Sequence, residues 1–195
     1  MPGPIDHPAV RRVLEAADRK GVQLEVVAFD ESTHTAQEAA AAVDAELGQI
    51  VKSLVFVAPL EDGTLEAIIC LVSGPDRVDV ARLAAVAAEP EIRRATAKEA
   101  NELTGFTIGG IPPVGFVRPL RVFMDPGLGR FPVVWAAAGL PTAVFAVPPG
   151  TQRILSNATV APITEERRAA DVASDIAAGG SDSVPTASPS ADPAP

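Results

Sequence analysis

The stretch of sequence that decides the fold is residues 50–72, which run IVKSLVFVAPLEDGTLEAIICLV. Its two halves are almost wholly apolar, and apolar residues at consecutive positions are typical of strands that are covered on both faces. We therefore predict strands over 50–58 and 65–72. The segment EDG at 61–63 combines acidic residues with glycine, so it is predicted to form the hairpin turn between the two strands.

Helix signals lie on both sides of this hairpin. Capping boxes start at Thr35 and Thr96, and Asp79 can cap a third helix. The predicted helices are 8–20, 36–42, 79–87 and 96–105, and the further predicted strands are 22–29, 106–108, 120–124, 133–137 and 143–147. With 15 glycines and 19 prolines, the chain is too rich in turn residues for a helical bundle. The predicted fold class is α+β, with a mixed, barrel-like β-sheet flanked by helices.

The chain of 195 residues is long enough for one domain and a tail. We assign residues 1–163 to the domain and 164–178 to a short helix or linker. Residues 179–195 consist mainly of proline, alanine and serine and contain one large aliphatic residue. Ordering them would bury too little apolar surface to offset the lost entropy, so this last segment is predicted to be disordered.

The composition excludes several classes of site. Aromatic residues make up 4% of the chain, which argues against nucleic-acid binding by base stacking. One cysteine and two histidines exclude an internal disulfide framework and most structural zinc sites. The sequence has no complete dinucleotide-binding or phosphate-binding glycine motif, so no cofactor is expected. The sequence has no apolar run of about 18 residues and no signal-peptide pattern at its start, and we expect a soluble, cytoplasmic protein.

The net charge is −9, but basic residues dominate the part of the chain between 111 and 160. One acidic residue there is outnumbered by arginines, namely Arg118, Arg121, Arg130 and Arg153. Scattered arginines usually form a solvated face, and the alternative is a local basic patch on an acidic protein. The sequence leaves both interpretations open.

Lys52 stands out because it interrupts an apolar strand. With a period of two, it shares its face with Ile50, Leu54 and Phe56. Burying an ammonium group on such a face is costly unless it has an anionic partner. Two interpretations stay open: the side chain reaches the rim or a carboxylate, or it is a ligand-binding group in the wall of a pocket.

The segment Gly109–Gly115, GGIPPVG, is the second candidate. Its first two glycines allow the backbone to approach a ligand closely, and its two prolines fix the loop without offering an N–H group. The amides of Gly109, Gly110 and Ile111 could therefore donate to an oxyanion or a phosphate, and the alternative is a rigid turn between strands. Cys70, by contrast, lies in an apolar run and is predicted to be a core thiol, because apolar surroundings raise the pKa of a thiol.

Four segments together resemble a known family. They are HTAQEAA at 34–40, VKSLVF at 51–56, TGFTIGGIPPVG at 104–115 and VWAAAG at 134–139. In order and spacing they look like the YbaK/ProX-type aminoacyl-tRNA editing domain, over about residues 8–162. The resemblance implies a compact α+β domain that hydrolyses the ester between a wrong amino acid and the 3′ adenosine of tRNA, without a metal. Members of the family act as free-standing proteins or as insertions in prolyl-tRNA synthetase.

The resemblance also implies roles for individual residues. Lys52 would hold the terminal phosphate or the ribose, or polarise the ester, while Gly109 and Gly110 would donate their amides to the developing oxyanion. The substrate-binding residues would be Ser53, Ile111, Pro112, Pro113, Gly115, Gly139, Phe29 and His34. A tRNA substrate also requires a local positive surface on this acidic protein, so the charge distribution predicts Arg118, Arg121 and Arg130 as tRNA-binding residues. The expected activity is deacylation of mischarged tRNA, with cysteinyl- or alanyl-tRNA(Pro) as the substrate and prolyl-tRNA synthetase as a further candidate partner.

The chain departs from the family pattern at several polar positions. Relatives often carry serine or threonine at Pro112, and a branch with two prolines in this loop tends to carry histidine at Phe116. Relatives also often carry serine or asparagine near Ala137 and a basic or histidine residue near Pro141 or Thr142. The alternative function is therefore a catalytically weak module that binds aminoacyl-tRNA, a nucleotide or a synthetase. A deacylation assay with several mischarged tRNAs separates the two functions.

Overall fold

The computed structural model describes residues 4–29 and 35–166. Nearly all of them lie in one compact unit, Met1–Glu165. The disordered segment predicted over 179–195 and the part of the predicted helix or linker from 167 onward lie outside the described residues. Thr164, at the start of that linker, forms an isolated antiparallel bridge with Val78.

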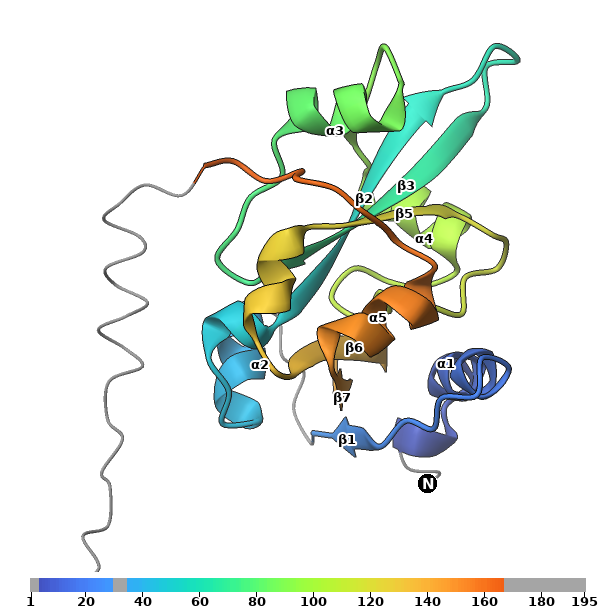
Figure 1. Ribbon diagram of the computed structural model, residues 1–195. Helices are drawn as coiled ribbons and strands as arrows, with labels where there is room; N and C mark the ends of the chain where they lie inside the picture. Colours follow the sequence, from blue (N-terminus) through green and yellow to red (C-terminus); the bar gives the residue numbers. More distant parts are fainter. Residues whose placement is uncertain (1–3, 30–34, 167–195) are drawn as a thin grey trace, which may run out of the picture. The chain divides into compact units, whose positions relative to one another are not determined.

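The strands form two open sheets (Figure 1). The larger sheet has the order β4-β2-β3-β5-β8, with bounds Arg93–Arg94, Val51–Pro59, Leu65–Ser73, Arg121–Met124 and Thr159–Val160. The smaller has the order β1-β7-β6, with bounds Val26–Ala28, Ala143–Val147 and Val134–Leu140. β2 is antiparallel to β3 and β4, whereas β5 is parallel to β3 and β8. The α+β class with a mixed sheet is therefore confirmed, with an isolated bridge between Ile50 and Trp135 joining two open sheets in place of a closed barrel.

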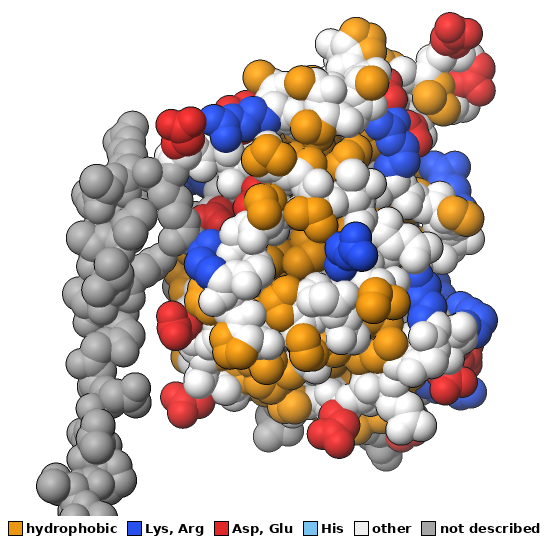
Figure 2. All heavy atoms as spheres, in the orientation of Figure 1, with side chains coloured by type: hydrophobic (Ala, Val, Ile, Leu, Met, Phe, Trp, Pro, Cys, Tyr) orange, Lys and Arg blue, Asp and Glu red, His pale blue; other side chains and the backbone are white. Residues whose placement is uncertain are grey.

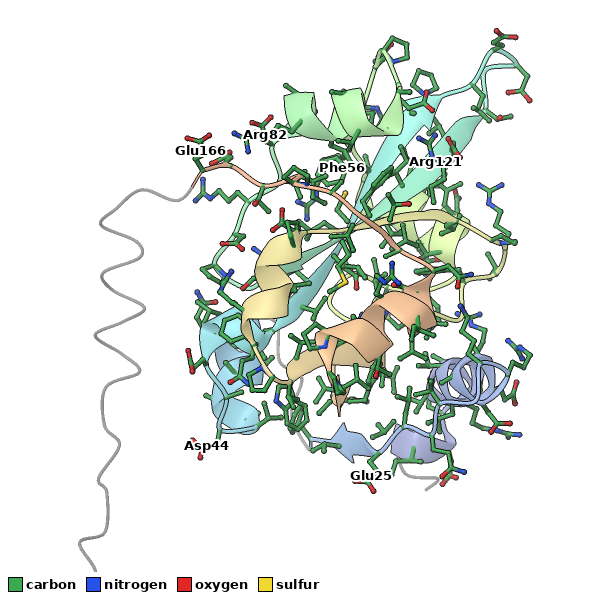
Figure 3. The ribbon with its side chains drawn as sticks, viewed as in Figure 1. Glu25, Asp44, Phe56, Arg82, Arg121 and Glu166 are labelled. Carbon is green, nitrogen blue, oxygen red and sulfur yellow. The ribbon has the colours of Figure 1, made fainter. Side chains whose placement is uncertain are left out.

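The long hairpin predicted from residues 50–72 is the centre of this arrangement. β2 and β3 pair from Val51 opposite Ser73 to Pro59 opposite Leu65. Both faces of the pair are covered, which explains the continuous apolar run. Val51, Val55 and Val57 belong to the main core with the smaller sheet, and Phe56 lies on the other face beneath α3 (Figure 3).

The helices begin largely where the capping signals predict. Their bounds are α1 Pro8–Asp18, α2 Ala36–Ala42, α3 Val80–Ala87, α4 Ala97–Thr104 and α5 Pro149–Ser156. Both capping boxes form, because the hydroxyl of Thr35 or Thr96 accepts from the glutamate N–H three residues later and that glutamate accepts in return. α5 was not predicted, since Pro148, Pro149 and Gly150 are typical of a loop. Proline is nevertheless tolerated in a first helical turn.

One predicted strand, 106–108, is wrong. The hydroxyl of Thr104 accepts from Phe106 N–H and donates to the Ala100 carbonyl, and Gly110 N–H donates to the Thr107 carbonyl. These local bonds hold the segment in a turn, so its backbone groups do not enter a sheet. The strand predicted over 22–29 is shortened to β1 for lack of a partner at its start.

Cys70 lies in the core under α3, where it is fully buried, and its burial raises the pKa of its thiol to about 12. A thiol with so high a pKa holds almost no thiolate at neutral pH, and the thiolate is the reactive form. We therefore expect no reaction with an aromatic disulfide reagent in the folded protein and stoichiometric reaction in denaturant. Labelling of the folded protein at the rate of a free thiol would show that this core opens readily.

Candidate active site

A cavity of about 220 Å³ lies along the edge of β2. Its walls come from α2, the start of β2, the segment between β4 and α4, the loop after α4, and the smaller sheet. The lining residues are predominantly apolar: Ala36, Ala39, Val43, Ile50, Val51, Leu54, Val55, Ala95, Ala100, Ile108, Ile111, Trp135, Ala136, Ala137 and Val144. The polar or basic side chains among the described lining residues are those of Thr35, Lys52, Ser53 and Arg94. The cavity therefore offers an apolar chamber with a cationic and hydroxylic border.

The cavity exists because the outer neighbour of β2 is short. β4 pairs only with Phe56 and Val57, and the chain then turns away at Ala95 to begin α4. Beyond that point Ile50 and residues 51–55 of β2 all line the cavity, and the outer edge of β2 is open between the Ile50 bridge to Trp135 and the Val55 carbonyl, which accepts from Ala95 N–H. An open strand edge is a row of unpaired backbone donors and acceptors, and here it forms part of the cavity wall.

Lys52 lies in the cavity wall. Its Nζ donates to the Asp76 carbonyl oxygen at 2.6 Å, which leaves two of its three protons for other acceptors. Burial lowers the pKa of Lys52; Asp76 opposes this shift, and Arg94 and Arg77 add to it. The ammonium therefore sits in a setting that disfavours its charge, as expected of a group that meets an anionic ligand.

Arg94 is a functional candidate that the sequence did not reveal. It pairs with Phe56 across the sheet, and its guanidinium lies 5.7 Å from the ring centre of Phe56. Since Phe56 and Lys52 share a strand face, Arg94 and Lys52 lie on the same side of β2, and both line the cavity. A short strand such as β4 carries too little periodicity to have been predicted, so only the register shows this pair.

The loop after α4 contributes Gly109 and Ile111 to the cavity. Gly109 has a positive φ of 91°, which favours glycine at this position. Gly110 has a different part: its N–H donates to Thr107, and a Cβ there would lie 2.7 Å from the carbonyl carbon of Leu140. The structure therefore gives Gly110 a packing role against the β6–β7 turn, and its amide is already engaged.

The remaining residues predicted for substrate binding are not gathered at the cavity. Pro112 is buried outside it, and Pro113 and Gly115 line a separate, wider hollow beside α1 and α5. Gly139 packs on α1, where a Cβ would lie 2.8 Å from the Ala9 carbonyl oxygen. Phe29 N–H donates to the Thr142 carbonyl in the smaller sheet. His34 lies outside the described residues.

None of the arginines predicted to bind tRNA lines the cavity. Arg121 donates to Glu66, Glu89 and the Ala87 carbonyl, beside the β2–β3 hairpin (Figure 3). Arg130 donates to Ser73 Oγ and the Gly127 carbonyl, and its guanidinium lies 3.8 Å from Asp76. Arg118 and the exposed Arg153 also lie outside the cavity wall, with Arg118 in the wider hollow. Figure 2 shows basic side chains gathered along the right-hand margin of the visible face, over α1 and the loop after α4 of Figure 1.

The structure shows the surroundings of two residues at which the chain departs from the family pattern, Ala137 and Phe116. Ala137 lines the cavity and leaves its wall apolar at that point. Phe116 packs edge-on against Phe106, with ring centres 6.4 Å apart, and lines the wider hollow. Among the described residues, no group of three His, Cys, Asp or Glu side chains could hold a metal ion. Nor is any helix in the described ranges long and apolar enough to cross a membrane.

Comparison with known proteins matches residues 30–154 to the model of the aminoacyl-tRNA editing domain family. The chain is 30% identical over 115 residues to the uncharacterized protein YwhH of Bacillus subtilis (strain 168), which covers 59% of this chain and 70% of that protein. It is also 30% identical over 92 residues to a proline–tRNA ligase of Limosilactobacillus fermentum, which covers 47% of this chain and 16% of the ligase. The chain thus spans a small part of the ligases that it matches.

The fold is also similar to a crystal structure of a protein proposed to be a trans-editing enzyme for prolyl-tRNA synthetase. The TM-score is 0.74 and the sequence identity 46%, over 82% of this chain and 99% of that chain. The match includes nearly the whole of the other structure, so the two agree over an entire domain.

Proposed function

Because the chain belongs to the aminoacyl-tRNA editing domain family, we propose that it is a free-standing deacylase that hydrolyses the ester of mischarged tRNA, with alanyl- or cysteinyl-tRNA(Pro) as its substrate. The observation that carries this proposal is the cavity at the edge of β2. It combines a small apolar chamber with two cations, Lys52 and Arg94, on one side of the strand.

The size of the chamber favours a small amino acid. Cavities for drug-sized ligands usually hold about 300–1,000 Å³, and this one holds about 220 Å³. Its floor consists of alanine, valine and isoleucine side chains, which bind a methyl or thiol group without requiring a polar partner. A synthetase pocket cannot strongly reject a smaller side chain, so a second, tighter site of this kind serves as the sieve.

The cation pair supports a phosphate contact. Lys52 and Arg94 lie close enough for Arg94 to contribute to the lowered pKa of Lys52. Two neighbouring cations repel each other, and an anion between them relieves both the repulsion and the cost of burial. The phosphate that precedes the terminal adenosine meets this requirement, with the aminoacyl group then directed into the apolar chamber.

The described lining residues include no Asp, Glu, His or Cys that could act as base or nucleophile. An aminoacyl ester is already activated, so a positioned water or the vicinal ribose hydroxyl suffices to start its hydrolysis. Water adds to the ester carbonyl, the bond to the ribose oxygen breaks, and the products are the free amino acid and the 3′-hydroxyl of tRNA. Lys52 has two protons left after its bond to the Asp76 carbonyl, and we propose that one meets the phosphate and that the other, with the backbone amides of Gly109 and Ile111, stabilises the developing oxyanion.

A deacylation panel tests this function. We expect the purified protein to hydrolyse alanyl- or cysteinyl-tRNA(Pro) well above the spontaneous rate and to spare prolyl-tRNA(Pro), because an editing site that hydrolysed the correctly charged product would undo the work of the synthetase. The release of labelled amino acid measures the rate for each ester. Tight binding of these tRNAs without any hydrolysis would instead establish the alternative, a module that only binds aminoacyl-tRNA.

A further inference from the structure

The outer edge of β2 at Ser53 presents backbone groups that the sheet does not use. Ala95 N–H donates to the Val55 carbonyl from the β4 side, so the backbone N–H and C=O of Val55 point away from β3. On the neighbouring strand, Asp125 N–H donates to the Leu71 carbonyl from the far side, and Leu71 is the residue opposite Ser53. The N–H and C=O groups of successive residues in a strand point to opposite sides, so those of Ser53 point to the same side as those of Val55. Both observations therefore place the N–H and C=O of Ser53 at the open edge.

The side chain of Ser53 adds a second observation. Its Oγ is buried and has no hydrogen-bond partner among the described residues. A buried hydroxyl without a partner is costly, and such a group in a native structure calls for a ligand or a water. Ser53 lines the cavity, and its outward-facing N–H and C=O and its buried, unpartnered hydroxyl all belong to this one residue of the wall.

The charges of the cavity decide which part of a substrate fits there. The α-amino group of an aminoacyl ester is a hydrogen-bond donor and is largely protonated near neutral pH. Lys52 and Arg94 repel it from the face that they share, and the described lining residues include no carboxylate to receive it. Acceptors remain at the Ser53 edge, where the carbonyl and the hydroxyl oxygen can each accept a hydrogen bond from the protonated α-amino group.

We propose that the open edge of β2 at Ser53 binds the free α-amino group of the aminoacyl moiety, through the Ser53 carbonyl and Oγ. The inference rests on the proposed function and adds the class of substrate to it: esters with a free α-amine. An acylated amine loses donors and gains bulk at this wall, so we expect peptidyl- and N-formyl-aminoacyl-tRNA to be poor substrates. The phosphate on the Lys52 side and the amine on the Ser53 side together fix the orientation of the ester.

Three esters of the same tRNA test the proposal: alanyl-, lactyl- and N-acetyl-alanyl-tRNA(Pro). Each enzymatic rate is divided by the spontaneous rate of that ester, because the amine itself speeds hydrolysis. We expect the normalised kcat/KM of the alanyl ester to exceed those of the other two roughly tenfold or more, as for a hydrogen bond to a charged group. Equal normalised values for all three esters would overturn the proposal.

The Ser53→Ala variant localises the contact. It is expected to lower kcat/KM roughly tenfold for the alanyl ester and to leave the lactyl ester within about twofold, since the Ser53 carbonyl can still accept the single proton of the lactyl hydroxyl, whereas the ammonium loses one of its two acceptors. The matched control is Ser156→Ala, whose buried hydroxyl donates to the Gln152 carbonyl away from the cavity and which should change neither value. An equal loss on both esters would contradict amine recognition, whereas no hydrolysis of any ester by the wild type would refute the proposed function itself.

Discussion

Replacing Lys52 with alanine is expected to reduce the hydrolysis of alanyl- or cysteinyl-tRNA(Pro) by about 10²–10³ in kcat, the usual effect of removing one preorganised donor from a transition state. The ammonium lies in the wall of the cavity, and the Asp76 carbonyl occupies one of its protons. Single-turnover deacylation measures the chemical step directly. Lys98→Ala, which removes an exposed lysine from α4, is the matched control and should retain the full rate.

The same substitution is expected to keep or raise the stability of the fold. Burial lowers the pKa of Lys52 from its ordinary value of 10.5, so below that value the folded protein carries a charge that the unfolded chain holds more cheaply. Between the lowered pKa and 10.5 the unfolded state binds more protons, and wild-type stability should therefore rise with pH in that window. Lys52→Ala should lack this rise when urea unfolding is followed from pH 7 to 10.5. A large loss of stability at neutral pH would assign Lys52 to the core instead of the site.

The central hairpin of the fold and the position of Lys52 in the site could be predicted from sequence because both depend on local patterns. The apolar run at 50–72 indicates a doubly covered hairpin, and a lysine within it is conspicuous. The capping boxes at Thr35 and Thr96 likewise depend on residues three positions apart. Patterns of this kind can be recognised within a short stretch of sequence, without knowledge of which distant segments pair.

The remaining features depend on pairings between distant segments. Arg94 becomes a partner of Lys52 only through the register of β4 against β2, and Arg121 is withdrawn from the predicted basic surface by Glu66 and Glu89. Gly110 resembles an amide donor in sequence, but its contact with Leu140 and its bond to Thr107 follow from the β6–β7 turn. Charge counts along the chain cannot show which arginines already have carboxylate partners.

Replacing Arg94 with alanine is expected to raise KM for aminoacyl-tRNA roughly tenfold while changing kcat little, because a phosphate contact contributes similar binding to the ground and transition states. The dependence of log KM on log salt concentration should weaken by about 0.7–0.9, the increment of one phosphate contact. Hydrolysis of 3′-alanyl-adenosine, which has no phosphate, should be unaffected by the substitution. This substrate separates a phosphate contact from general damage to the cavity.

Arg118→Ala provides the comparison, because Arg118 lies in the wider hollow and was predicted to bind tRNA on the strength of sequence alone. If the acceptor end enters past Arg94, the Arg118 variant should keep both its KM and its salt dependence near the wild-type values. If instead Arg118→Ala raises KM and Arg94→Ala does not, the acceptor stem lies over α1 and α5, and the cation pair beside β2 holds no phosphate. The two variants therefore determine whether the acceptor end of the tRNA contacts the border of the cavity at Arg94 or the wider hollow at Arg118.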